Sequence, residues 1–267
     1  MGRTREKMAA ENLMDLTGRV AVVMGGTSGI GRVLAAGLAR AGADVVATGR
    51  REKMVDEVAV EVESAGRRTL RKTCDVCSRE SVDQFRDVVM AQFGQVDILL
   101  NAAGQIFRKP TMDVSEAEWN SLMDVNLTGM LRACQSFYPA LKANRRGRII
   151  NIASLNSFVA LVQVTAYAAS KAAVLALTRS LAVEWAKDGI NVNAIMPGVF
   201  RTDMNAAFLD GTERGKELRL RTPMGRFGNA QELVGAAVLL ASDASGFITG
   251  HSIAVDGGFL ASGVNSI

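Results

Sequence analysis

Short apolar runs alternate with longer amphipathic stretches along almost the whole chain, and this alternation restricts the fold more than any other feature. Seven runs predict β-strands, at 19–24, 44–48, 69–73, 96–101, 148–152, 191–195 and 252–255. Longer stretches between them carry apolar residues at helical spacing, at 31–41, 52–65, 78–93, 115–143 and 165–187. Strands that are apolar throughout and alternate with helices predict a parallel sheet covered on both faces. The sequence therefore predicts one doubly wound α/β domain with a seven-stranded parallel sheet.

Length and composition exclude several other classes of protein. The chain has 267 residues, of which 48% are apolar and 22% charged, a balance typical of a globular protein with a sizeable core. The net charge of +4 is scattered along the chain, so a nucleic-acid partner is not indicated. No apolar run approaches the ~20 residues of a membrane-spanning helix. We expect a protein that binds neither nucleic acid nor membrane.

The cysteines and the N-terminus bear on the cellular compartment. Cys74, Cys77 and Cys134 are an odd and sparse set, which fits a reducing cytoplasm better than a disulfide framework. Cys74 and Cys77 could supply two ligands of a zinc site, but the chain has only one histidine and no second cysteine pair. We therefore expect no metal site. Residues 1–14 lack the apolar segment of a secretory signal. They are predicted to form a disordered tail before a single catalytic domain at 15–267.

A glycine-rich turn directly follows the first predicted strand and opens a helix. In this context glycines let the backbone approach a pyrophosphate, whose charge the helix N-terminus stabilises. The alternative is that these glycines serve only the turn itself. The position between strand and helix favours a dinucleotide site of the Rossmann type. The predicted contacts are Gly25, Thr27, Ser28, Gly29, Ile30 and Gly31.

The end of the second predicted strand bears on the choice of cofactor. An acidic side chain there would accept hydrogen bonds from an unphosphorylated ribose, but Thr48 is followed by Gly49 and then by Arg50 and Arg51. A guanidinium suits a 2′-phosphate. The sequence thus favours NADP, with NAD still possible. The alternative is that the two arginines only begin a solvated helix.

Tyr167 and Lys171 stand four residues apart on a predicted helix, so their side chains share a face. A neighbouring cation favours the phenolate, and we expect Lys171 to lower the pKa of Tyr167 and make it a proton donor or acceptor. Ser154 follows the strand at 148–152, on the ligand-binding edge of such a sheet. Its hydroxyl would hold a substrate oxygen beside the phenol. Separately these residues are common, but their order after the glycine-rich turn is not.

With these motifs in place, residues 16–258 resemble the short-chain dehydrogenase/reductase family. The resemblance implies a catalytic set of Asn126, Ser154, Tyr167 and Lys171, in which Asn126 holds a water near Lys171. It also implies that Tyr167 and Lys171 contact the cofactor. The remaining implied cofactor contacts are Asp75, Val76, Asn101, Ala102, Gly104, Pro197, Gly198, Val199 and Thr202. Met24 and Ala102 depart from the residues usual in the family.

The same resemblance implies a reaction. Ser154 would hydrogen-bond the carbonyl oxygen, and Tyr167 would donate a proton as hydride arrives, or remove it in the oxidative direction. Lys171 would bind the nicotinamide ribose. Family members usually form tetramers through the two long helices and the last strand, so we expect a homotetramer.

Substrate residues are expected in three loops, 105–110, 155–164 and 200–227. Arg108 would bind a carboxylate by paired hydrogen bonds, and the other predicted substrate contacts are Ser154, Asn156, Tyr167 and Met204. Residues 200–227 fit either a mobile lid or an ordinary exposed helix pair. The context of Arg108 and the stretch 221–228 look most like the sugar-acid branch of the family, the gluconate 5-dehydrogenases and deoxygluconate dehydrogenases.

Two alternatives share part of this pattern. A 3-oxoacyl-carrier-protein reductase would have the same catalytic motifs. Arg132 matches one of its docking arginines, but Asp188 stands at the other position and would repel an acidic carrier. A catalytically silent NADP-binding sensor would keep the glycine-rich turn and lose Tyr167 or Lys171, and this chain keeps both.

Overall fold

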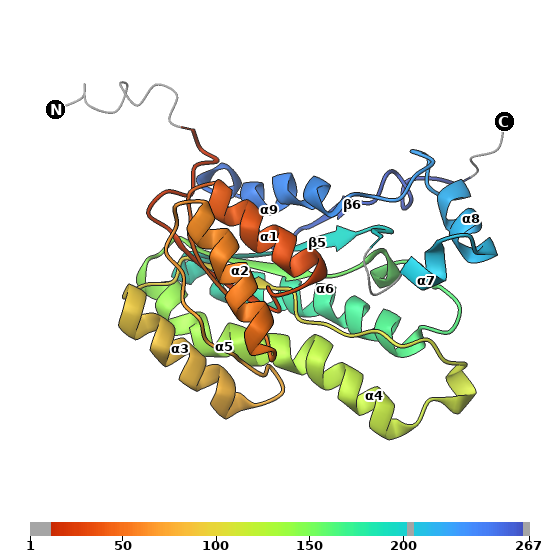
Figure 1. Ribbon diagram of the computed structural model, residues 1–267, viewed down its shortest axis with the longest axis horizontal. Helices are drawn as coiled ribbons and strands as arrows, with labels where there is room; N and C mark the ends of the chain where they lie inside the picture. Colours follow the sequence, from red (N-terminus) through yellow and green to blue (C-terminus); the bar gives the residue numbers. More distant parts are fainter. Residues whose placement is uncertain (1–11, 202–205, 264–267) are drawn as a thin grey trace.

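A six-stranded parallel sheet forms the centre of the molecule (Figure 1). The computed structural model describes residues 12–201 and 206–263. The strands are β1 (Val20–Met24), β2 (Asp44–Thr48), β3 (Ile98–Asn101), β4 (Gly147–Ile152), β5 (Ile190–Pro197) and β6 (Ser252–Val255). Their spatial order is β2-β1-β3-β4-β5-β6, and every adjacent pair is parallel. The predicted doubly wound α/β architecture is confirmed.

The prediction of seven strands is wrong, because residues 69–73 form no strand in the structure. This segment runs beside the outer edge of β2, held at its two ends by hydrogen bonds from the Val45 amide to the Arg68 carbonyl and from the Cys74 amide to the Gly49 carbonyl. None of its five side chains is buried. A segment without a buried face gains little from pairing along its whole length, so the ladder stays incomplete.

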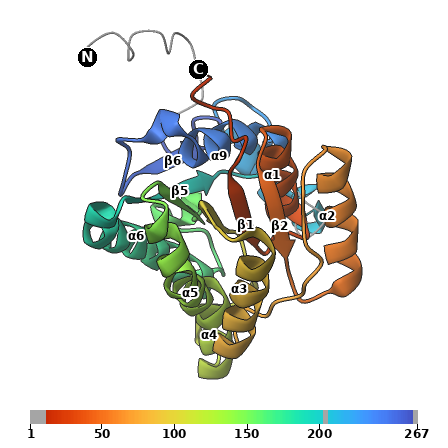
Figure 2. The same ribbon diagram turned by 90° about the vertical axis from the view of Figure 1, so that its left-hand side faces the viewer.

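Helices cover both faces of the sheet (Figure 2). Helices α1 (Gly29–Arg40), α2 (Glu52–Ser64) and α9 (Val234–Ala241) pack on one face, in a core with Leu34, Leu38 and Val62. Helices α3 (Arg79–Phe93), α5 (Gly129–Ala143) and α6 (Thr165–Trp185) pack on the other, where Phe85 and Phe137 meet edge to face. Burial on both sides explains why the strands are apolar throughout.

The stretch 115–143, predicted as one helix, is divided. Helix α4 (Glu116–Met123) runs into a π-helical segment, η2 (Asp124–Thr128), before α5 begins. A π-helical turn holds one residue more than an α-helical turn, which changes the direction of the side chains in it. Asn126 lies in this segment and is fully buried.

Short elements complete the chain. Helices α7 (Ala206–Leu209) and α8 (Glu213–Leu220) lie beyond the carboxyl ends of the strands (Figure 1). Leu209 and Leu218 pack there with Leu155 and Phe259. The 3₁₀ segments are η1 (Thr111–Asp113), η3 (Leu155–Ser157), η4 (Ala186–Asp188), η5 (Ala230–Leu233) and η6 (Asp243–Ser245).

The predicted tail at 1–14 lies mostly outside the described residues. Of its residues, 12–14 are described, and the Leu13 carbonyl accepts a hydrogen bond from the Ala244 amide. None of the helices in the described ranges has the length and apolar character needed to cross a bilayer.

Candidate active site

The candidate site lies where the strand order reverses. From β1 the chain passes to β2 on one side and later returns to β3 on the other, so the carboxyl ends of β1 and β3 border a crevice. Such a reversal is the usual ligand site of an open α/β sheet. The turn after β1 and the segment after β3 meet there.

Gly25 shows how closely these two segments approach. A Cβ atom added at Gly25 would lie 2.5 Å from the Cα and the amide nitrogen of Ala103, and its φ of +77° is also unfavourable for other residues. The Ala102 amide donates to the Met24 carbonyl at 2.8 Å. Glycine is required at this position by the fold itself.

The start of α1 is open to a ligand. Its N-cap residue, Ser28, forms no side-chain cap bond, and a Cβ atom added at Gly29 would meet nothing within 4 Å. By contrast, the amides of Gly25 and Gly26 both donate to the Thr48 carbonyl. The first turn of α1 therefore offers the amides that an anionic group could bind, with the favourable end of the helix dipole behind them.

Arg50 and Arg51 lie beside this turn, at the end of β2. Thr27 sits over Gly49, where an added Cβ atom would lie 2.6 Å from the threonine Oγ1. Both arginines are exposed, and within the described part of the chain neither forms an ion pair. No carboxylate occupies the tip of the strand, because β2 ends at Thr48. These residues fit a phosphorylated ribose better than a free one.

The other predicted cofactor residues border the same edge. The Asp75 carboxylate accepts a hydrogen bond from the Cys77 amide, and Val76 packs where a Cβ atom on Gly129 would lie. Gly198, after the last residue of β5, donates its amide to the Val255 carbonyl. Asn101 ends β3 with its Oδ1 buried and without a partner among the described residues. Predicted contacts Thr202 and Met204 lie outside the described residues.

Tyr167 and Lys171 lie in the first two turns of α6 and share a face of the helix, as their spacing predicts. The Lys171 Nζ lies 5.7 Å from the centroid of the Tyr167 ring and donates a hydrogen bond of 2.7 Å to the Ile152 carbonyl. Ile152 is the last residue of β4, and Ser154 follows two residues later. The helix and the strand end thus bring together the three residues of the predicted proton-transfer set.

The expectation that Lys171 lowers the pKa of Tyr167 is wrong for this structure. Burial raises the pKa of the Tyr167 phenol, and the Ser154 hydroxyl acts in the opposite direction without overcoming it. Burial also lowers the pKa of Lys171 to about 8. Desolvation disfavours the charged form of both groups, and the lysine Nζ is bound to a carbonyl beside the ring instead of to the phenolic oxygen.

Ser154 and Asn156 lie next to each other at the end of β4. Ser154 is 7% exposed, and its Oγ accepts a hydrogen bond of 3.2 Å from the Asn156 amide. Asn156 is 8% exposed, and its side-chain Nδ2 has no partner within the described residues. An unpaired buried donor costs about 1–3 kcal/mol, so it indicates a group that a substrate oxygen would satisfy.

Asn126 holds the segment that follows β3. Its Oδ1 accepts from the Gln105 amide at 2.8 Å, and its Nδ2 donates to the Gln105 carbonyl and to the Ser170 Oγ, both at 3.0 Å. Gly104 lies between Asn126 and Lys171, since an added Cβ atom would be 3.5 Å from the Asn126 Oδ1 and 3.7 Å from the Lys171 Nζ.

Sequence reasoning missed the partners in these contacts, which are Gln105, Ser170 and the Ile152 carbonyl. Ser170 is buried beside the lysine of the motif, and this position was the one available signal. The backbone groups of Gln105 and Ile152 carry no side-chain signal at all.

Arg108, Arg132 and Asp188 were singled out in the sequence for binding. Arg108 is exposed on the segment after β3. Arg132 forms an ion pair of 2.8 Å with Asp124 and donates to the Val76 carbonyl. Asp188 accepts hydrogen bonds from Tyr138 and Lys142. The two residues considered for carrier docking are therefore engaged inside the chain.

The surroundings of Cys74 and Cys77 favour neutral thiols. Burial raises the pKa of Cys74 and Cys77 to about 11, so both thiols stay protonated. Within the described ranges, no group of three or more His, Cys, Asp or Glu side chains could hold a metal ion.

Comparison with known proteins finds relatives that match nearly the whole chain. A family model described as enoyl-(acyl carrier protein) reductase matches residues 25–260. The chain is 41% identical to 2-dehydro-3-deoxy-D-gluconate 5-dehydrogenase of Dickeya dadantii, covering 94% of this chain and 98% of the relative. It is 36% identical to gluconate 5-dehydrogenase of Gluconobacter oxydans, over 96% and 100% of the two chains. A crystal structure of a gluconate 5-dehydrogenase from Burkholderia cenocepacia, in complex with NADP and tartrate, superimposes with a TM-score of 0.90 at 38% identity, over 94% and 98%.

Proposed function

Because the chain belongs to the short-chain dehydrogenase/reductase family, we propose that it is an NADP-dependent oxidoreductase that interconverts a secondary alcohol and a ketone on a sugar acid such as gluconate. The observation that carries the proposal is the convergence of Ser154, Tyr167 and Lys171 at the carboxyl end of the sheet. Identity of 36–41% to sugar-acid dehydrogenases over almost the full length supports the substrate class. Residues 15–267 form the catalytic domain in this proposal.

The residues present fit NADP. The open first turn of α1 would hold the pyrophosphate, and Arg50 or Arg51 would bind the 2′-phosphate. Asp75, Val76, Asn101, Ala102 and Gly104 would border the adenosine and nicotinamide ends. Pro197, Gly198 and Val199 would complete the nicotinamide side. The cofactor, when bound, supplies or accepts the hydride.

In the reductive direction Ser154 would donate a hydrogen bond to the carbonyl oxygen and stabilise the negative charge that develops on it. The Tyr167 hydroxyl would give its proton to that oxygen as hydride reaches the carbon. The raised pKa keeps the phenol protonated beforehand. Lys171, with a pKa of about 8, would then return a proton to the phenolate at near-neutral pH. Asn156 would donate to a further substrate oxygen with its unpaired Nδ2.

A spectrophotometric screen tests this function. The purified protein is assayed with NADPH and with NADH against 5-ketogluconate, neutral ketoses and a β-keto thioester. We expect NADPH oxidation with 5-ketogluconate at the highest kcat/KM. Preference for the thioester would instead favour a 3-oxoacyl-carrier-protein reductase. A tenfold preference for NADH, which is about 1.4 kcal/mol, would contradict the role of Arg50. Tight NADPH binding without turnover of any carbonyl would favour a sensor.

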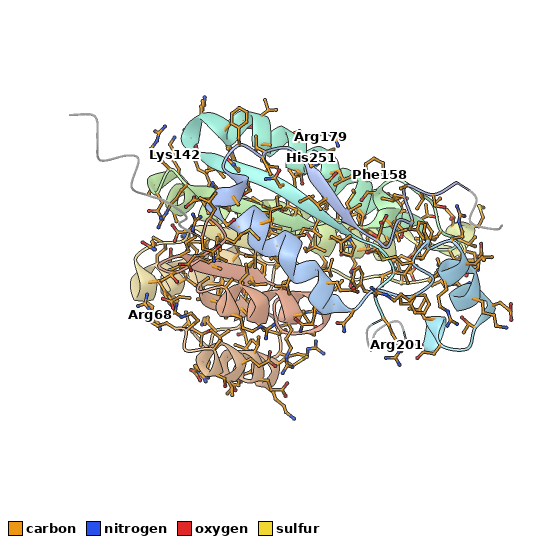
Figure 3. All side chains as sticks on the ribbon, turned by 90° about the horizontal axis from the view of Figure 1, so that it is seen from above. Arg68, Lys142, Phe158, Arg179, Arg201 and His251 are labelled. Atoms are coloured by element: carbon orange, nitrogen blue, oxygen red, sulfur yellow. The ribbon has the colours of Figure 1, made fainter. Side chains whose placement is uncertain are left out.

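We also propose that the enzyme acts in the cytoplasm as a homotetramer. The side of the molecule formed by α6 and β6 supports this assembly, since Phe158, Arg179 and His251 lie exposed along it (Figure 3). Val183 of α6 is 82% exposed. Burying Phe158 and Val183 against another copy of the chain would remove apolar surface from water, which favours association. Light scattering on the purified protein measures the mass, and a monomer would exclude the tetramer.

A further inference from the structure

Within the described residues, Arg214 of α8 forms no ion pair with an acidic side chain, although the sequence offered no reason to separate it from its charged neighbours. The nearby arginines and lysine on this side are paired or stacked. Arg201, visible in Figure 3, binds Asp210 with two nitrogens, Lys216 binds Glu213, and Arg219 lies over the Phe227 ring. Among the described residues no carboxylate forms an ion pair with Arg214, whose Nη1 donates only to the Val162 carbonyl at 3.3 Å.

Arg108 reaches the same place from the segment after β3. The Lys109 amide donates to the Gln163 carbonyl at 2.9 Å, one residue from the carbonyl that Arg214 binds. The Lys109 ammonium is occupied by Glu118 at 2.8 Å. Arg108 itself is exposed and forms no ion pair within the described ranges.

The charge of Arg108 reaches the guanidinium group of Arg214. The pKa of Arg214 is lowered first by burial and then by the charge of Arg108, while the charge of Glu217 acts in the opposite direction. Two like charges brought together from separate segments are unfavourable unless an anion is bound between them. No structural ion pair of the described chain offsets this repulsion.

The position of this pair relates it to the reacting groups. Val162 and Gln163 lie just before α6, close in the chain to Tyr167 in its first turn. Leu218, one turn after Arg214, belongs to the same apolar cluster as Leu155, the residue after Ser154. Arg108 follows Gly104 by four residues, and at about 3.5 Å per residue it lies within roughly 14 Å of the Lys171 environment. The long Arg108 side chain and a six-carbon acid can together span such a distance.

We propose that Arg214 and Arg108 together form a two-guanidinium site that binds the carboxylate end of the substrate, while Ser154 and Tyr167 hold its carbonyl. This inference rests on the proposed function and deepens it. It makes the enzyme selective for a carbonyl compound whose anionic group lies several carbons from the reacting carbon. Paired guanidinium groups suit a carboxylate because each presents two parallel donors.

The test compares two substrates that differ only at the carbon that carries the negative charge. L-Sorbose is 5-ketogluconate with a hydroxymethyl group in place of the carboxylate. We expect Arg214→Ala to lower the ratio of kcat/KM for 5-ketogluconate to that for L-sorbose at least tenfold, through KM. Arg214→Lys should recover part of the ratio, because it keeps the charge and loses the fork. Lys216→Ala is the matched control, since it removes a cation from the same helix and should leave the ratio unchanged.

A second readout separates this site from the proposed function. Tartrate serves as the anionic probe, and its stabilisation of the protein is measured by thermal unfolding with and without Arg214→Ala. Loss of the tartrate shift in the variant supports the two-guanidinium site even if no sugar acid is turned over. A lack of turnover would refute only the proposed function. If 5-ketogluconate is reduced and Arg214→Ala changes neither the ratio nor the tartrate shift, the two-guanidinium site is wrong. Equal loss with both substrates would also overturn it, because it would indicate a packing role.

Discussion

Lys171 is a nearly buried cation at the candidate site. It is 4% exposed, and its Nζ donates to the Ile152 carbonyl, with the Tyr167 ring alongside. Burial lowers its pKa to about 8 and raises the pKa of Tyr167. The lysine is therefore the stronger acid of the two in the folded protein, which favours proton transfer from Lys171 to the Tyr167 phenolate.

Replacing Tyr167 by Phe should remove most of the activity. The substitution keeps the ring and its packing and deletes the hydroxyl that we propose as the proton donor. We expect kcat/KM to fall by at least about 100-fold, the usual contribution of a positioned acid or base. NADPH binding, measured by fluorescence, serves as the control and should persist. Turnover equal to that of the parent would refute the proposed reaction.

Lys171 also predicts a pH dependence of stability. Its pKa is about 8 in the folded protein and 10.5 ordinarily, so between these values the unfolded chain holds more protons. The free energy of unfolding contributed by this group must then rise with pH across the window. Between pH 7.5 and 9.5 we expect the parent to gain about 2 kcal/mol relative to Lys171→Met in urea unfolding. A difference between the two proteins that stays constant with pH would contradict the lowered pKa.

Among the elements, the π-helical segment η2 connects the segment after β3 to α6 at the candidate site, through Asn126. It interrupts the helix between α4 and α5 and turns Asn126 toward the segment after β3. Through Asn126 the segment holds both backbone groups of Gln105 and contacts Ser170 of α6. Three elements are thereby fixed relative to one another, and the loop that carries Arg108 starts from a defined point.

Asn126→Ala tests this role. Loss of the amide leaves the Gln105 amide and carbonyl without partners, so we expect a loss of about 1–3 kcal/mol of unfolding free energy. Hydrogen exchange of the Gln105 amide should become faster in the folded protein. Asn120→Ala, at an exposed position of α4, is the control and should change neither quantity. Unchanged exchange at Gln105 would show that η2 does not hold the loop.

For the whole molecule, one acidic residue joins distant parts of the chain at the amino end of the sheet. Asp243 forms ion pairs with Arg19 at 2.6 Å and Arg148 at 3.6 Å, and both guanidinium groups are nearly buried. Arg19 precedes β1, Arg148 lies in β4 and Asp243 follows α9. The buried charges stay compensated only when these three parts are assembled.

Removing this carboxylate should destabilise the fold without touching the opposite, catalytic edge. In Asp243→Asn the two guanidinium groups lose their counter-charge. Because Asp243 itself is more than half exposed, we expect a loss of only about 1–2 kcal/mol. Urea unfolding measures it. The change should exceed that of Asp210→Asn, which removes an exposed pair, and a smaller effect at Asp243 would contradict the role.

Much of the fold could be predicted because its signals are local. Apolar runs bounded by turns located six strands, and helical spacing located α1, α2, α3 and α6. Residues 69–73 misled the prediction, because their two β-branched threonines report a local preference and not whether a buried face is available. The division of 115–143 was missed for a related reason, since an additional residue in one turn leaves the neighbouring helical pattern intact.

The sequence alone determined which chemical groups the chain carries and that the end of β1, the end of β4 and the start of α6 lie at one edge, because strand direction in a parallel sheet decides that. Only the tertiary structure decided what each group meets. The direction of the Tyr167 and Lys171 pKa shifts depends on burial, and the clamp of Asn126 on Gln105 and the approach of Arg214 to Arg108 join segments distant in the chain. Such contacts depend on packing between elements, and no periodicity within one element reports them.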